Sequence, residues 1–171
     1  MREVTCCFRM MQPCLAGIKN VTAKDQTHPY VPGQPEAGLA LGERGASEPH
    51  FIFNKDASGR ALLMQENWTR LFVYACKGLG ISLDNAHAVS MDPSVEGTIE
   101  RYRRYYDHKK PSLYKIHEAF LVGSKPIFKA MVDDPATVPQ LRRMLEIGGR
   151  YAGLTVFGWR LYGRFEVLDC G

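Results

Sequence analysis

Residues 141–167 constrain the fold most, because they contain a helical pattern, a glycine-rich segment and a strand pattern in direct succession. The helix is expected from Pro139 to Gly148, with the proline near its first turn. Its apolar face is formed by residues at helical spacing, namely Leu141, Met144, Leu145 and Ile147. The closing strand is predicted over Tyr162 to Leu168. The C-terminal part of the chain should therefore be a helix that leads through glycines into a strand.

The segment between this helix and strand combines backbone freedom with positive charge and aromatic rings. Glycines at positions 148, 149, 153, 158 and 163 permit positive φ and the close approach of another backbone. The side chains interspersed with them are Arg150, Trp159, Arg160, Tyr162 and Arg164. This combination favours contact with a phosphate chain; the alternative is a tight connection with Trp159 in the core. The segment lacks the Walker and Rossmann patterns, so we expect no nucleotide cofactor.

Other patterns place strands and one more helix before this stretch. Residues 4–18 predict an opening strand that bends at Pro13. Asn67 to Leu79 has the spacing of a core-facing helix, with Asn67 as its cap and Gly78 or Gly80 as its stop. Further strands are expected at 51–53, within 84–95, and as a pair at 113–122 and 126–133.

The resulting order of strand, loop, helix, strands, helix and strand is the split βαβ order of the ferredoxin-like fold. We therefore predict an α+β protein with a ferredoxin-like or RRM-like antiparallel sheet and two helices packed on one face. The other face of such a sheet stays available, as in single-stranded RNA binders. At 171 residues and 45% hydrophobic, the chain should form a single domain over 1–171. Residues 20–50, with four prolines and four glycines, are expected to be a long loop insertion.

Positive charge is concentrated locally, because 22 Lys and Arg against 18 Asp and Glu give a net charge of only +4. Segment 100–117 interleaves cations with tyrosines, namely Arg101, Arg103, Arg104, Lys109 and Lys110 with Tyr102, Tyr105, Tyr106 and Tyr114. Cations release counterions from a phosphate backbone, and each stacked base gains about 1 to 3 kcal/mol from an aromatic partner. The alternative is a solvated helix face or loop whose tyrosines pack on the core.

These two basic and aromatic segments, distant in sequence, could share one surface. The residues that we expect to bind nucleic acid there are Arg101, Arg103, Arg104, Tyr105, Lys109, Lys110, Arg150, Trp159, Arg160, Tyr162 and Arg164. His108 or His117 could serve as a general acid or base in RNA cleavage, because imidazole titrates near neutral pH. The simpler interpretation is a phosphate-contacting or exposed histidine.

The cysteines and histidines show no disulfide or metal pattern. The five cysteines form no C-x-x-C pair and the five histidines no H-x-x-x-H pair, so we expect reduced thiols, no metal and no cofactor. Cys6 and Cys7 should point to opposite faces of a strand, so at most one is buried. No signal peptide or membrane-spanning run is found, which favours a cytoplasmic protein without a membrane partner.

The C-terminal sequence GGRYAGLTVFGWRLYGRFEV, residues 148–167, resembles the glycine-rich motif of the repeat-associated (RAMP) proteins that bind guide RNA in CRISPR effector complexes. Phage-encoded proteins of unassigned role end similarly, and FRMMQPCL at 8–15 and FLVGSKPIFK at 120–129 look like their corresponding strands. The resemblance implies a ferredoxin-like binder of RNA or single-stranded DNA whose loop 148–163 lies against the nucleic-acid backbone. It also implies a homo-oligomer along the strand, or CRISPR-type ribonucleoprotein subunits as partners.

Our leading hypothesis is a non-enzymatic protein that binds single-stranded nucleic acid with strong salt dependence and little sequence preference. A second hypothesis is an interaction protein, such as a phage inhibitor, that uses the same basic surface to occupy a host nucleic-acid-processing or CRISPR complex. A third is a metal-independent endoribonuclease. In the leading hypothesis the ligand is RNA or single-stranded DNA.

Overall fold

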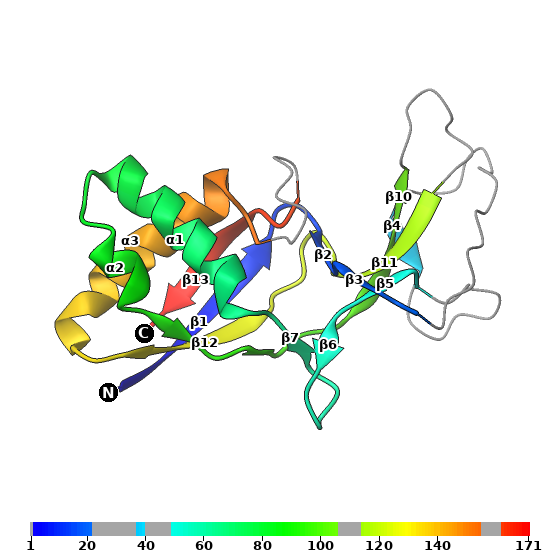
Figure 1. Cartoon of the computed structure of the whole chain (residues 1–171), viewed down its shortest axis with the longest axis horizontal. Coiled ribbons are helices and arrows are strands. Elements are labelled where there is room, and N and C mark those ends of the chain that lie inside the picture. The colour runs from blue at the N-terminus through cyan, green and yellow to red at the C-terminus, as the bar shows by residue number, and fades with distance from the viewer. Residues whose placement is uncertain (1, 22–36, 40–48, 106–113, 155–161) are drawn as a thin grey trace.

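The computed structural model describes residues 2–21, 37–39, 49–105, 114–154 and 162–171. These residues form two neighbouring halves, a sheet covered by helices and a second sheet built from inserted strands (Figure 1). One buried apolar cluster draws residues from both, with Trp68 and Phe128 in the first half and Phe53 and Phe120 in the second. The two halves therefore share a continuous core.

The first half has the ferredoxin-like arrangement. Its strands, β1 (Arg2–Met10), β8 (Ser90–Met91), β12 (Ile127–Val132) and β13 (Phe165–Cys170), are antiparallel in the order β13-β1-β12-β8. In the chain, helix α1 (Gln65–Leu79) lies between β1 and β8, and helix α3 (Val138–Tyr151) lies between β12 and β13. This is the split βαβ order, so the predicted α+β, ferredoxin-like class is confirmed.

Both long helices cover the same face of this sheet (Figure 1). Every second residue of β1 is buried on that side, namely Val4, Cys6, Phe8 and Met10. The Phe8 ring stacks on Phe165 with 4.2 Å between centroids, and Trp68 of α1 meets Phe128 of β12 edge-on at 4.8 Å. These rings hold helices and sheet together, because each removes a large apolar surface from water and adds a favourable ring contact.

Two glycines inside α3 allow this close packing. A Cβ atom on Gly148 would overlap the Leu71 side chain of α1, and one on Gly149 would overlap the Phe165 ring of β13. The sequence analysis assigned both glycines to a segment that approaches phosphate. That assignment was wrong, because the helix continues to Tyr151 and buries both of them against its neighbours.

The second half is built from strands inserted after β1 and after β8. Its main sheet, which we call the inserted sheet, contains β2 (Cys14–Leu15), β3 (Ile18–Lys19), β4 (Ala37–Leu39), β5 (Phe51–Ile52), β10 (Glu100–Tyr105) and β11 (Tyr114–Phe120). The order is β3-β5-β11-β10-β4, and β2 also pairs with β11. A small sheet is formed by β6 (Asn54–Lys55), β7 (Ala61–Leu62) and β9 (Ser94–Val95). The inserted sheet requires both insertions, because strands β10 and β11 of the second insertion pair with strands β4 and β5 of the first.

Several of the predicted strands pair with strands other than those expected. Residues 4–18 contribute β1, β2 and β3 instead of one bent strand, because Pro13 has no N–H for a ladder. The strands expected at 113–122 and 126–133 exist, but β11 joins the inserted sheet and β12 joins the ferredoxin-like sheet. Gly123, with φ of 83°, makes the turn that leads from one sheet to the other. The segment 20–50 is not purely a loop, since it contains β4.

Element boundaries also differ from the prediction. Helix α1 begins at Gln65, so Asn67 lies in its first turn instead of capping it, whereas Gly80, with φ of 67°, ends it as expected. A short helix α2 (Asp84–His87) occupies part of the region where only a strand and turn were expected. A turn of 3-10 helix, η1 (Pro135–Thr137), precedes α3, and β13 begins three residues later than predicted.

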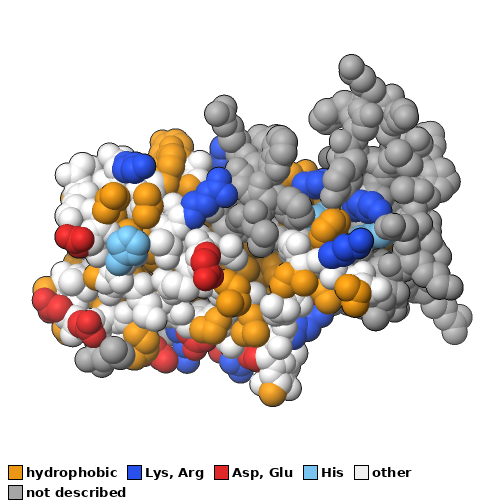
Figure 2. Space-filling model, in the orientation of Figure 1, with side chains coloured by type: hydrophobic (Ala, Val, Ile, Leu, Met, Phe, Trp, Pro, Cys, Tyr) orange, Lys and Arg blue, Asp and Glu red, His pale blue; other side chains and the backbone are white. Residues whose placement is uncertain are grey.

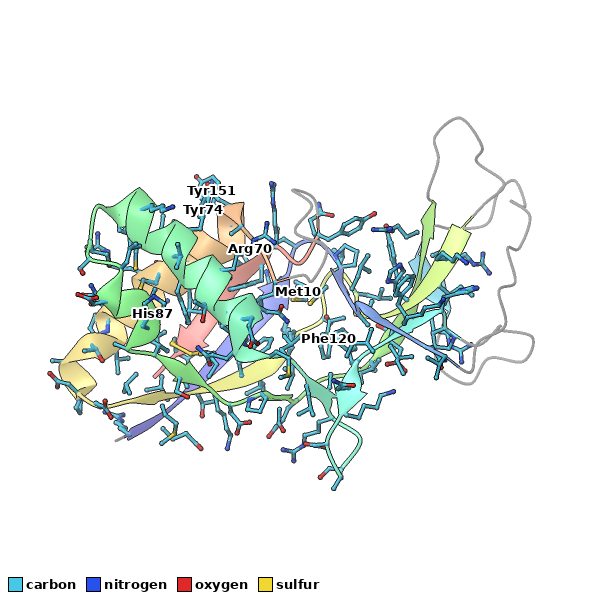
Figure 3. The ribbon with its side chains drawn as sticks, viewed as in Figure 1. Met10, Arg70, Tyr74, His87, Phe120 and Tyr151 are labelled. Carbon is cyan, nitrogen blue, oxygen red and sulfur yellow. A yellow bond between two sulfur atoms is a disulfide. The ribbon has the colours of Figure 1, made fainter. Side chains whose placement is uncertain are left out.

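Three segments that are far apart in sequence meet between the two halves. Met10 N–H donates to the Ser124 carbonyl (2.9 Å), and Met11 N–H donates to the Arg164 carbonyl (2.8 Å). Gly163 N–H donates to the Pro13 carbonyl at 2.8 Å. We call residues 10–13, 123–124 and 163–164 the central junction; Met10, labelled in Figure 3, marks its place. The junction joins the end of β1, the turn after β11 and the start of β13.

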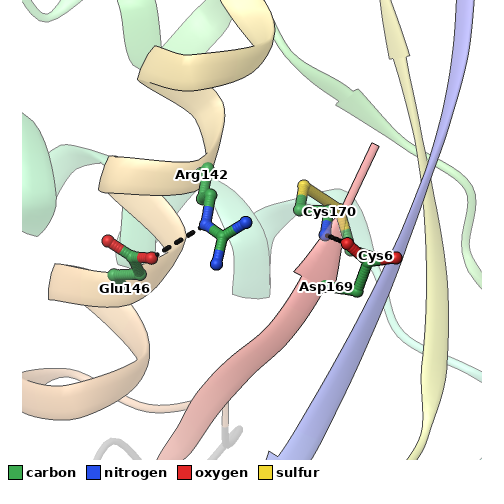
Figure 4. The surroundings of a disulfide bond; sticks show 5 residues. All are labelled: Cys6, Arg142, Glu146, Asp169 and Cys170. Atoms are coloured by element: carbon green, nitrogen blue, oxygen red, sulfur yellow. Dashed lines mark hydrogen bonds and ion pairs between the residues drawn. A yellow bond between two sulfur atoms is a disulfide. The ribbon is translucent and has the colours of Figure 1, made fainter.

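A disulfide joins Cys6 of β1 to Cys170 of β13 (Figure 4). The two residues are register partners in the antiparallel ladder, and Asp169 Oδ1 accepts the Cys170 N–H at 2.9 Å. The expectation of reduced thiols was wrong for this pair, since 164 positions separate the two cysteines and no spacing pattern connects them. Cys6 is buried and Cys7 is partly exposed, as strand alternation predicted.

Replacing Gly149 with Ala should destabilise the protein by about 1 to 3 kcal/mol, because the added methyl group would overlap the Phe165 ring. Gly78 in α1 is the matched control, since a Cβ there meets only Ile147 at an ordinary 3.5 Å. Gly78→Ala should stabilise the protein by up to about 1 kcal/mol through helix propensity. Urea denaturation measures both effects, and equal free energies of unfolding would contradict the packing role of Gly149.

Candidate nucleic-acid interface

The basic segment forms strand β10, so its side chains alternate between the two faces of the inserted sheet. Arg101 and Arg103 point to one face, whereas Tyr102 and Arg104 point to the other. The sequence analysis grouped the three arginines on one surface. Strand geometry divides them, because residues that share a face in a strand are two positions apart.

The face that carries Tyr102 also presents cations and rings from neighbouring strands. We call it the Tyr102 face, and register partners across β10, β11, β5 and β3 place on it Tyr102, Arg104, Lys115, His117, Phe51 and Lys19. Of these residues, His117 is buried, Lys19 is exposed and the others are partly exposed. Figure 2 shows Lys and Arg side chains over the inserted sheet. Cations beside rings are what phosphates and stacked bases require.

The glycine-rich segment reaches this face through Tyr162. The rings of Tyr102 and Tyr162 meet edge-on, with 6.0 Å between centroids and 76° between planes. The two segments that the sequence analysis singled out, which are distant along the chain, are therefore in contact.

The backbone on both sides of residues 155–161 is held tightly. Leu154 N–H donates to the Gly163 carbonyl, and the buried Cys14 thiol donates to the Leu154 carbonyl, each at 2.8 Å. Burial raises the pKa of Cys14 to about 12, so the thiol keeps its proton. Gly153 and Gly163 have φ of 77° and 69°, and a Cβ on either would lie 2.5 Å from a backbone carbonyl oxygen. Only glycine fits these two positions.

Hydrogen bonds hold the backbone of Arg164, the residue just before β13 begins. Its carbonyl accepts N–H groups from Met11 (2.8 Å) and Gln12 (3.1 Å). Its side-chain Nε is buried and has no hydrogen-bond partner among the described residues. A phosphate oxygen is the kind of acceptor that would satisfy this donor.

His117 lies in the core of the inserted sheet. Its ring stacks on Phe51 with 4.5 Å between centroids, and its Nδ1–H donates to the Ala16 carbonyl at 2.8 Å. Burial, and secondarily the charges of Arg104 and His50, lowers the pKa of His117 to about 4 although the hydrogen bond opposes the shift. For His117, the expectation of an exposed or phosphate-contacting histidine was wrong, and its buried neutral ring is poorly placed for acid–base catalysis.

The opposite face of the inserted sheet contains a buried carboxylate. Glu118 is 3% exposed and accepts hydrogen bonds from Lys55 Nζ (2.6 Å) and Phe53 N–H (3.0 Å). Its register partner on β10 is Arg101. The negative charge of Glu118 lowers the positive potential on this side. Lys55 offsets this charge, however, and Glu100, two residues before Tyr102, places a carboxylate on the Tyr102 face as well. The contact between Tyr102 and Tyr162 is therefore what distinguishes the Tyr102 face.

The uncovered face of the ferredoxin-like sheet differs from an RRM-type RNA platform. Its charged side chains form cross-strand ion pairs, Glu3 with Lys129 at 3.1 Å and Arg9 with Glu166 at 2.8 Å. The residues of β1 and β12 that point to this side are aliphatic, polar or charged, and none is aromatic. Paired charges without rings offer a single strand little to stack on. The face is open, as predicted, but the cations and rings of the Tyr102 face lie on the inserted sheet instead.

The other predicted residues are less central or lie outside the described part of the chain. Arg150 is exposed in the last turn of α3, with its guanidinium carbon 5.5 Å from the Tyr151 ring centroid. Tyr105 ends β10. Outside the described residues lie His108, Lys109, Lys110, Trp159 and Arg160. The sequence analysis missed Lys19, Phe51 and Lys115, because their place depends on pairing between strands. The alternation of side chains along 114–120 is the one sequence signal that could have placed Lys115 on the same face as His117.

Within the described ranges, no three His, Cys, Asp or Glu residues gather as metal ligands. None of the described helices is long and apolar enough to cross a membrane.

No protein-family model matches this chain, and neither does any curated protein. Among solved structures, it is similar to a chain in the cryo-EM structure of the Type III-B Cmr-beta bound to cognate target RNA, with a TM-score of 0.58 and 12% sequence identity. The match covers 99% of this chain and spans 59% of the length of that one. At this identity the likeness concerns the fold, and it is consistent with the resemblance to RAMP proteins.

The buried His117 predicts that stability falls in mild acid. Its pKa is 6.5 ordinarily and about 4 in the folded protein, so the unfolded chain binds a proton first as the pH falls through this window. The free energy of unfolding should decrease by about 3 kcal/mol from this group between pH 7 and pH 4. In urea denaturation across that range, the free energy of unfolding of His117→Gln should depend less on pH than that of the wild type. The exposed His87 serves as control, and an equal reduction in His87→Gln would contradict the assignment.

Proposed function

We propose that this protein binds single-stranded nucleic acid, with RNA as the favoured ligand, along the Tyr102 face and past Tyr162 and Arg164. The observation that supports the proposal most strongly is the edge-on contact between Tyr102 and Tyr162, which unites the two basic and aromatic segments. Each segment alone has a structural explanation. Together they present rings and cations from three regions of the chain at one place.

The proposed recognition is electrostatic and sequence-tolerant. Arg104, Lys115 and Lys19 would neutralise phosphates and release counterions, while the exposed parts of the two tyrosine rings would stack on bases. Every nucleotide has a phosphate and a flat base face, so these contacts discriminate little between sequences. Strong salt dependence is the expected signature.

The structural neighbour supports RNA as the ligand, since it belongs to Type III-B Cmr-beta bound to cognate target RNA. We propose that this chain acts as a RAMP-like subunit of a ribonucleoprotein in the cytoplasm of a bacterial or phage-infected host cell. Several copies along one strand would be compatible with such a role. An inhibitor that uses the same face against a host complex is the alternative if nucleic acid does not bind. The buried position of His117 makes a nuclease less favoured.

The double variant Arg104→Gln, Lys115→Gln should weaken binding of labelled single-stranded RNA, because it removes two cations from the Tyr102 face. The slope of log K against log salt should become less negative by about 1.4, since each contact with a single strand contributes about 0.7. At moderate salt the affinity should fall roughly tenfold. Fluorescence anisotropy over a salt series measures both quantities.

Arg9→Gln, Lys129→Gln is the matched control, because it removes the same charge from the uncovered face of the ferredoxin-like sheet. These surface ion pairs contribute little to stability, so the control should fold normally. It should keep most of the affinity and salt slope. Equal losses in both variants would place the binding surface elsewhere, and no binding of RNA or DNA at low salt would reject the proposed function.

A further inference from the structure

Two large apolar side chains are exposed beside the central junction. Met11 is 50% exposed and Val122 is 61% exposed. Gly123 N–H donates to the Met10 carbonyl at 2.8 Å, so the residues that follow β1 and β11 are held next to each other. Hydrogen bonds from the neighbouring residues thus fix the backbone that presents both side chains.

The same junction holds Arg164. The Arg164 carbonyl accepts the Met11 N–H, and the buried Arg164 Nε has no hydrogen-bond partner in the described part of the chain. Tyr162, which contacts Tyr102, is two residues away. The backbone that carries the two apolar side chains is therefore bonded to Arg164, two residues from the end of the proposed binding face.

We infer that Met11 and Val122 form a base-contacting subsite for the strand that the Tyr102 face binds, with Arg164 on an adjacent phosphate. The inference rests on the proposed function. A nucleobase has flat faces of low polarity, and a thioether makes favourable contacts with aromatic rings. Apolar side chains also contact and separate bases in other nucleic-acid complexes.

Scattered apolar residues are normal on protein surfaces, and Met64 and Leu83 are exposed to 52% and 44%. Met11 and Val122 differ from these in two respects. They are presented by one hydrogen-bonded junction, and Met11 is bonded through its backbone to Arg164, whose Nε has no hydrogen-bond partner in the described part of the chain.

The test compares two labelled probes of equal charge, an oligothymidylate of about ten nucleotides and an abasic deoxyribose-phosphate chain of the same length. Met11→Gln, Val122→Thr keeps the side-chain size but removes apolar surface. It should weaken thymidylate binding roughly three- to tenfold and leave abasic binding unchanged, because only the base contact is lost. Met64→Gln, Leu83→Gln is the matched control and should change neither affinity.

Equal losses for both probes, or no loss for either, would overturn the subsite. Unchanged abasic binding also reports that the variant is folded. Failure of the wild type to bind either probe, together with no binding of single-stranded RNA at low salt, would instead reject the proposed function. Because the phosphate-binding variant Arg104→Gln, Lys115→Gln should weaken both probes alike, the two kinds of contact are measured separately.

Discussion

Backbone hydrogen bonds at the central junction join the two halves and hold the residues on either side of Tyr162 and Arg164. Gly163 donates to Pro13 and accepts from Leu154, so it ties the end of the glycine-rich segment to the end of β1. Its positive φ and the nearby Leu154 carbonyl leave no room for a side chain. From this anchor, Tyr162 reaches the inserted sheet and Arg164 reaches Met11. The three stretches that carry the resemblance to RAMP and phage proteins, at 8–15, 120–129 and 148–167, are the ones that meet here.

The fold class could be predicted because it depends on local patterns. Helical spacing located α1 and α3, and the order of elements then indicated the ferredoxin-like sheet. The inserted sheet could not be predicted in the same way, since short strands such as β4 and β5 are defined by their partners. Strand β10 was missed because alternating arginines and tyrosines have no apolar face. The sequence also could not show that Gly148 packs inside a helix whereas Gly163 makes a turn, since only their contacts distinguish these two roles.

The ferredoxin-like half and the inserted sheet have different surfaces. The ferredoxin-like half uses its helix-covered face for the aromatic core and balances charge on its open face through ion pairs. The inserted sheet adds a second surface, on which Arg104, Lys115 and Lys19 lie beside the Tyr102 and Phe51 rings. Glu118 is buried on the side of Arg101, so the carboxylate and the Tyr102 face are kept apart. Fold alone therefore does not locate a binding surface, and the proposed interface rests on the cations and rings that the inserted strands bring together.

The position of β1 has a consequence for how the chain folds. This first strand lies in the middle of its sheet, and its two neighbours, β12 and β13, come from the last third of the sequence. Almost the whole chain must be present before the apolar side of β1 is covered and its ladder closes. Such non-local pairing slows folding and leaves an unpaired strand available to other chains in the meantime. While the chain is being synthesised, β1 would have to pair quickly or be shielded from other chains until β12 and β13 emerge.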